Sequence, residues 1–102
     1  MSNDKLFGML GLAARARKIV AGTEIVTEKI KANKGVNLVL IASDVSQNTL
    51  KKLVNCCEYY GIEYIQLQRT QNEISNAIGK RCLTSSVAVL DRNFSEAIKK
   101  LV

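Results

Sequence analysis

The segment VNLVLIAS, residues 36–43, is a nearly continuous apolar run of strand length and is rich in Val, Leu and Ile. A run of this kind is typical of a strand that is buried on both faces, because neither set of alternating side chains is suited to water. We therefore expect residues 36–43 to form a central strand of a sheet that is covered on both sides.

Helical and extended patterns alternate on both sides of this segment. Residues 3–17 carry apolar side chains at three-to-four spacing, and the next helix is expected to hold Ile25, Val26 and Ile30 on one side. The full expected order is helix 3–17, strand 18–22, helix 23–33, strand 36–43, helix 46–61 with Ser46 as its N-cap, strand 62–67, helix 70–79, strand 84–91 and helix 93–101. Such alternation predicts an α/β fold in which a sheet lies between layers of helices.

Length and charge bound the possible functions. The 102 residues are enough for one core, so we expect a single domain over residues 1–102. Lys and Arg outnumber Asp and Glu by 15 to 9, which gives a net charge of +6. This excess favours a polyanionic partner, although it would also serve solubility alone. With three Tyr, two Phe and no Trp, the chain has few aromatic rings for a base-stacking platform.

The composition excludes several catalytic chemistries. Because the chain has no His, Ser-His and Cys-His nucleophile pairs are impossible, and its scattered acids form no evident acid–base pair or metal cluster. We expect no enzymatic activity, no cofactor and no metal. Asp44 follows the central strand as a phosphoacceptor aspartate would, but the further acids that would hold magnesium are missing, which favours a helix-entry role.

The cysteines and the apolar pattern indicate the compartment. Cys56, Cys57 and Cys82 are odd in number and two are adjacent, which argues against a disulfide framework, and the adjacent pair is expected to act as small hydrophobic residues of a helix. No apolar run reaches the roughly 20 residues that a membrane span needs, and residues 1–10 do not have the pattern of a secretory signal. We expect a cytoplasmic protein with no membrane partner.

Two loops combine glycine with cations. In the first, RARKIVAGT (residues 15–23) carries Arg15, Arg17 and Lys18 and then delivers Gly22-Thr23 to a helix N-terminus, where free amides and the helix dipole favour an anion. In the second, Gly79-Lys80-Arg81 lies between a helix and a strand. Each loop alone is consistent with an ordinary turn that carries solvated charge. Together they indicate an α/β domain that binds a polyanion, without specifying which one.

Four stretches carry a resemblance to a known family. LGLAARARKIVAGTEIVTEKI, LVLIASDVSQNT, CEYYGIEYIQL and ISNAIGKRCLTSSVAVLD have the order and spacing of the ribosomal protein L7Ae/L30e family of kink-turn RNA-binding proteins, including its short bacterial members. The resemblance covers nearly the whole chain. It implies a three-layer α-β-α sandwich with a four-stranded mixed sheet, which agrees with the alternation of helices and strands described above.

The resemblance implies binding to RNA rather than catalysis. Members of the family grip a sharply bent RNA at tandem sheared G·A pairs, which implies recognition of RNA shape and a few base edges, with no readout of DNA sequence. The helix start at Gly22, Thr23, Glu24 and Ile25 would face the guanines, and Arg17 and Lys18 would meet phosphates. The loop of Gly79, Lys80, Arg81, Cys82 and Leu83 would pack on looped-out nucleotides, and Ser46, Leu50 and Gln71 would line a pocket for a flipped-out nucleotide. The implied partner is structured RNA, ribosomal RNA included, bound by a monomer.

The chain departs from the family pattern at four positions. Glu24 and Ile25 stand where Asn-Glu or Lys-Gln is common, and Glu28 and Gln71 stand where Lys is usual. Ile25 can make no hydrogen bond to a base edge, and a carboxylate at Glu28 repels a nearby phosphate backbone. Glu24 can still accept from the N1 and N2 donors of a guanine. The departures leave an alternative open, in which the same fold serves as a protein-interaction module with an exposed apolar patch.

Overall fold

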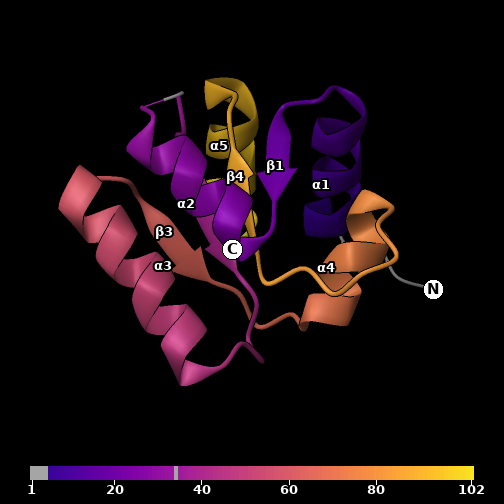
Figure 1. Cartoon of the computed structure of the whole chain (residues 1–102). Helices are drawn as coiled ribbons and strands as arrows, with labels where there is room; N and C mark the ends of the chain where they lie inside the picture. Colours follow the sequence, from indigo (N-terminus) through magenta and orange to yellow (C-terminus); the bar gives the residue numbers. More distant parts are fainter. Residues whose placement is uncertain (1–4, 34) are drawn as a thin grey trace.

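A computed structural model describes residues 5–33 and 35–102, and it shows a mixed sheet between two layers of helices (Figure 1). The expected three-layer α-β-α sandwich is confirmed. The helices are α1 (Lys5–Arg15), α2 (Thr23–Lys31), α3 (Gln47–Tyr60), α4 (Gln71–Ile78) and α5 (Arg92–Lys99), and the strands are β1 (Ile19–Ala21), β2 (Leu38–Ile41), β3 (Tyr64–Gln66) and β4 (Ser86–Val89).

The strand order fixes which loops meet at each edge of the sheet. The order is β1-β4-β2-β3, with β2 parallel to β3 and β4 antiparallel to both of its neighbours. As a result β1, β2 and β3 all end at the edge where β4 begins, which we call the carboxyl edge. They begin at the opposite edge, where β4 ends, which we call the amino edge.

The central strand divides the core into two halves. All four residues of β2 are fully buried, as the apolar run predicts. Leu38 and Leu40 belong to a cluster with side chains of α1, α4 and α5, whereas Val39 and Ile41 belong to a cluster with side chains of α2 and α3. Alternating residues of one strand therefore serve opposite layers, which explains why neither face could be polar.

Helix ends follow local sequence signals. Ser46 caps α3 as expected, because its hydroxyl accepts from Thr49 N–H, and Gly61 ends α3 in the left-handed conformation with φ +68°. The capping box at α4, in which Thr70 and Glu73 each accept from the other's backbone N–H, was not part of the sequence interpretation.

One expected face was wrong. In α2, Val26 and Ile30 are buried in the core, as expected, but Ile25 is 47% exposed. The third buried position of α2 is Thr27, whose hydroxyl is satisfied by the carbonyl oxygens of Thr23 and Glu24, so Ile25 falls outside the buried stripe.

Two glycines of α1 provide a matched test of helix packing. A Cβ on Gly11 would lie 3.2 Å from the Ala77 carbonyl oxygen in α4, whereas a Cβ on Gly8 would meet nothing within 4 Å. We expect Gly11→Leu to lower the free energy of unfolding by about 1–3 kcal/mol through overpacking. Gly8→Leu should leave it unchanged or raise it by up to about 1 kcal/mol through helix propensity. Urea denaturation measures both, and equal effects would contradict the close approach of α1 and α4.

Candidate nucleic-acid interface

The N-terminus of α2 is open. Gly22 precedes it with φ +105° and ψ 144°, a conformation available essentially to glycine alone, and a Cβ there would meet nothing within 4 Å. Side chains cap α3, α4 and α5, but among the described residues no side chain caps α2. Within the described residues, the N–H groups of Thr23, Glu24 and Ile25 therefore have no hydrogen-bond acceptor, and they lie at the positive end of the helix dipole.

The second glycine–cation loop is joined directly to this helix start. Thr23 Oγ1 lies 2.6 Å from Ser85 Oγ, and Gly22 N–H donates to the Ser86 carbonyl oxygen at 2.9 Å. These contacts arise because β1 ends where β4 begins. The start of α2 and the segment that leads from the second loop into β4, which are about sixty positions apart in sequence, therefore lie side by side at the carboxyl edge, as Figure 1 shows.

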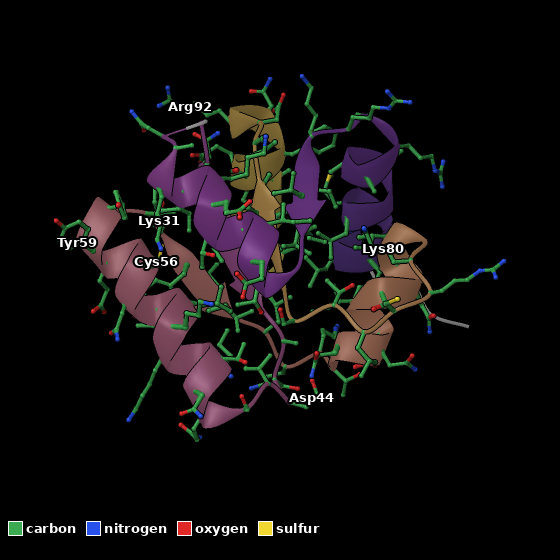
Figure 2. The ribbon with its side chains drawn as sticks, viewed as in Figure 1. Lys31, Asp44, Cys56, Tyr59, Lys80 and Arg92 are labelled. Carbon is green, nitrogen blue, oxygen red and sulfur yellow. The ribbon has the colours of Figure 1, made fainter. Side chains whose placement is uncertain are left out.

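A buried hydroxyl supports the loop from beneath. Ser75 in α4 is 2% exposed, and its Oγ donates to the Cys82 carbonyl oxygen at 2.6 Å and lies 2.9 Å from Thr84 Oγ1. With the backbone held from inside, the outer side chains of the loop are left to solvent: Lys80, Arg81, Cys82 and Leu83 are all exposed, and Figure 2 shows Lys80 beside α1 and α4.

The expected nucleotide pocket is only partly assembled. Gln71 N–H donates to Asp44 Oδ1 at 2.9 Å, and Gln71 Nε2 donates to the Asp44 carbonyl oxygen at 3.4 Å, so the end of β2 and the start of α4 are tied together at the carboxyl edge. Asp44 therefore bonds to the first residue of α4 rather than to the helix that follows it in the chain, α3, which Ser46 caps. Ser46 is exposed but engaged as the cap of α3, and Leu50 packs against the core between α2 and α3.

The cations that precede β1 in the sequence do not lie at the start of α2. The fold does not bring Arg17 and Lys18 to the start of α2, because β1 separates Lys18 from Gly22 by four positions, about 13 Å of extended chain. Lys18 is at the amino edge, where its carbonyl oxygen accepts from Leu90 N–H at 2.7 Å. Arg15 instead lines a groove between α1 and α4 that also includes Gly79.

An ion pair offsets the acid at the helix start. Lys52 Nζ in α3 lies 3.0 Å from Glu24 Oε2, with both side chains about half exposed or more. Exposed pairs of this kind contribute at most about 1 kcal/mol, but the pair places a cation beside the carboxylate that would otherwise repel an anion. Sequence reasoning missed Lys52 because 28 positions separate the two residues.

The cysteines differ sharply in environment. Cys57 is fully buried, and burial raises the pKa of its thiol to about 11, so it stays protonated and unreactive at neutral pH. Cys82 is exposed on the loop after α4. Within residues 5–33 and 35–102, no group of three His, Cys, Asp or Glu side chains could hold a metal ion.

Comparison with known proteins identifies the family. A sequence model of the ribosomal protein L7Ae/L30e/S12e/Gadd45 family matches residues 4–99. The chain belongs to this family. Membership agrees with the expectation, drawn from the residues, that this is not an enzyme.

Relatives in the L7Ae family match over the full length. The chain is 37% identical to the RNA-binding protein YlxQ of Bacillus subtilis over 102 residues, covering all of this chain and 99% of the relative. It is 31% identical to the RNA-binding protein YlxQ of Enterococcus faecium, covering 99% of this chain and 94% of the relative.

In the described part of the chain, no helix is long and apolar enough to cross a membrane.

Solved structures share the L7Ae-family fold. A Bacillus halodurans protein of unknown function superposes with a TM-score of 0.88 at 33% identity over 97% of both chains. The Giardia lamblia 15.5kD RNA binding protein superposes with a TM-score of 0.79 at 18% identity, covering 99% of this chain and 88% of that one, which shows the fold alone.

Removing the buried hydroxyl should loosen the loop. We expect Ser75→Ala to lower the free energy of unfolding by about 1–3 kcal/mol, because the Cys82 carbonyl and the Thr84 hydroxyl would lose a buried partner. Asn76→Ala, at the exposed neighbouring position, should change it by less than about 0.5 kcal/mol. Chemical denaturation measures both, and a neutral Ser75→Ala would show that the loop does not depend on this hydroxyl.

Proposed function

We propose that this chain binds structured RNA with a sharp bend, such as a kink-turn, through the carboxyl edge, and that it does so as a cytoplasmic monomer. The observation that carries the proposal is the bonding of the uncapped start of α2, through Gly22 and Thr23, to Ser85 and Ser86, the segment that leads from the basic loop into β4. The names of its YlxQ relatives support RNA as the ligand. The ribosomal proteins for which the family is named point to ribosomal RNA as one source.

The chemistry of this surface suits folded RNA. The outward N–H groups of α2 can donate to phosphate oxygens or to guanine O6 and N7, and Lys80 and Arg81 can neutralise phosphates on the adjoining stem. Ile25 and Leu83 are 47% and 65% exposed and can pack on unstacked bases. Shape, backbone charge and a few base edges are the features by which proteins recognise bent RNA, whereas an apolar Ile25 alone would read no sequence.

One observation favours the alternative of a protein-interaction module. A groove of about 790 Å³ between α1 and α5 is lined largely by apolar groups, and Leu12 and Leu101 on it are 51% and 36% exposed. This groove does not include the start of α2 or the loop after α4. A variant within it therefore separates the two functions.

The proposal is tested by titration with a kink-turn RNA at several salt concentrations. We expect Arg81→Ala and Lys80→Ala each to weaken binding and to reduce the slope of log K against log salt by about 0.7–0.9, because each removes a phosphate contact. Lys100→Gln removes a cation outside the carboxyl edge and should change neither quantity. Leu12→Gln, in the groove between α1 and α5, should also be neutral.

The wild-type chain offers a second readout without mutation. Cys82 on the loop should be alkylated rapidly in the free protein and protected by bound kink-turn RNA, while buried Cys57 stays unmodified in both samples. If the RNA neither binds at low salt nor protects Cys82, the proposed function is wrong and the interaction module takes its place.

Glu28 differs from every other acid of the described chain. The carboxylates of the others cap a helix or pair with Lys or Tyr: Glu24, Asp44, Glu58, Glu63, Glu73, Asp91 and Glu96. Within the described residues, the side chain of Glu28 forms no hydrogen bond or ion pair, and it is exposed. It lies one turn after Glu24 on the helix proposed to face RNA, so its charge acts on the ligand without compensation.

We therefore expect Glu28→Lys to tighten binding of kink-turn RNA several-fold at low salt and to steepen the salt slope by about 0.7–0.9. Glu58→Lys, a change of the same charge on α3, is the control, and it should have a smaller effect on affinity. Unchanged or weaker binding by Glu28→Lys would show that this side of α2 does not face the RNA.

A further inference from the structure

Two adjoining segments at the amino edge carry three cations, away from the proposed RNA site. Arg17 and Lys18 precede β1, and Arg92 begins α5 just after β4. The hydrogen bond from Leu90 N–H to the Lys18 carbonyl oxygen, at 2.7 Å, holds these two segments together. Figure 2 places Arg92 at the end of the molecule opposite Asp44, which is at the carboxyl edge.

Within residues 5–33 and 35–102, these cations have no ionic partner. Arg17, Lys18 and Arg92 are exposed, and among the described residues none of them forms an ion pair. The acid between them, Asp91, is already occupied, since its carboxylate accepts from Phe94 N–H at 3.1 Å as the cap of α5. The edge therefore presents three uncompensated positive charges on two adjoining segments.

Arg17 adopts a left-handed backbone conformation that is unfavourable for an arginine. It has φ +59°, and its N–H donates to the Ala14 carbonyl while Lys18 N–H donates to the Ala13 carbonyl. The same pair of hydrogen bonds ends α3 at Gly61, with φ +68°, and α4 at Gly79, with φ +77°. Glycine adopts this left-handed position without cost, whereas a residue with a Cβ is disfavoured there. Of these three equivalent ends, one carries an arginine where glycine would fit better.

We propose that the amino edge is a second RNA site, at which Arg17, Lys18 and Arg92 bind the phosphate backbone of an RNA stem other than the one held at the carboxyl edge. The two segments, residues 15–18 and 90–92, contain no aromatic residue on which a base could stack. The proposed contact is therefore between the cations and the phosphates of the RNA backbone. Because the two edges are separated by the length of the strands, the protein can hold two RNA segments at once.

The decisive variant is Arg17→Gly, because it removes the cation and relieves the backbone. We expect its melting temperature to rise by about 2–6 °C. Its affinity for a plain RNA duplex without a bend should nevertheless fall several-fold, with a salt slope smaller by about 0.7–0.9. Loss of binding in a more stable protein cannot be ascribed to misfolding. Arg92→Gln should weaken duplex binding to a similar degree.

The matched control is Lys100→Gln. Lys100 is an exposed cation that forms no ion pair within the described residues, and it follows α5 at its other end, about 12 Å along the helix from Arg92. Its loss changes the net charge by the same amount as the loss of Arg92, so unchanged duplex affinity would show that position, rather than total charge, matters.

Simultaneous binding is tested by capture. Kink-turn RNA is attached to beads and saturated with protein, and the beads are then offered a fluorescent plain duplex. Wild type and Lys100→Gln should capture the duplex, whereas the double variant Arg17→Gly, Arg92→Gln should remain bound to the beads but capture little. Equal capture by the double variant and the wild type would overturn the proposal.

Titration of the free protein with the plain duplex separates this inference from the proposed function. Failure to bind kink-turn RNA, with duplex affinity still dependent on Arg17 and Arg92, would refute the carboxyl-edge function and leave the amino-edge site standing. Duplex affinity and salt slope that are the same in wild type and Arg17→Gly would refute the amino-edge site, whatever the kink-turn result.

Discussion

The antiparallel insertion of β4 between β1 and β2 is the constraint on which the arrangement of this molecule depends. It sets the start of β4 beside the ends of β1 and β2, so Gly22 N–H reaches the Ser86 carbonyl and Thr23 reaches Ser85. With β4 parallel instead, the chain after α4 would enter the sheet at the amino edge, beside Lys18, rather than beside the start of α2. The RNA surface that we propose therefore follows from strand direction before it follows from any charged side chain.

Much of the fold could be predicted from sequence because its signals are local. The apolar run at residues 36–43 predicted the buried strand, and Ser46, Gly61 and Gly79 marked helix ends by the preferences of capping and left-handed positions. Gly22 was singled out correctly as a special position, since its φ of +105° does require glycine. Each of these inferences needs only residues within one or two turns of the chain.

The candidate site could be predicted only in part, because proximity in sequence is a poor guide across a strand. Arg17 and Lys18 are within six residues of Thr23 but lie at the opposite edge, whereas Ser85 is 62 positions away and in contact with it. The pairing of Lys52 with Glu24 and the support of Cys82 by Ser75 are likewise tertiary. No periodicity reveals such contacts, since they depend on strand order and helix packing.

Acidic and basic side chains differ in how often they have a partner within the fold. Seven of the eight acids in the described residues are engaged within the fold, as caps or in pairs, whereas most of the described cations form no ion pair. An approaching polyanion therefore meets cations at the loop of Lys80 and Arg81 and again at Arg17 and Arg92. Because capping holds several carboxylates against helix starts while most described cations extend into solvent, the position of each charge matters as much as the net charge.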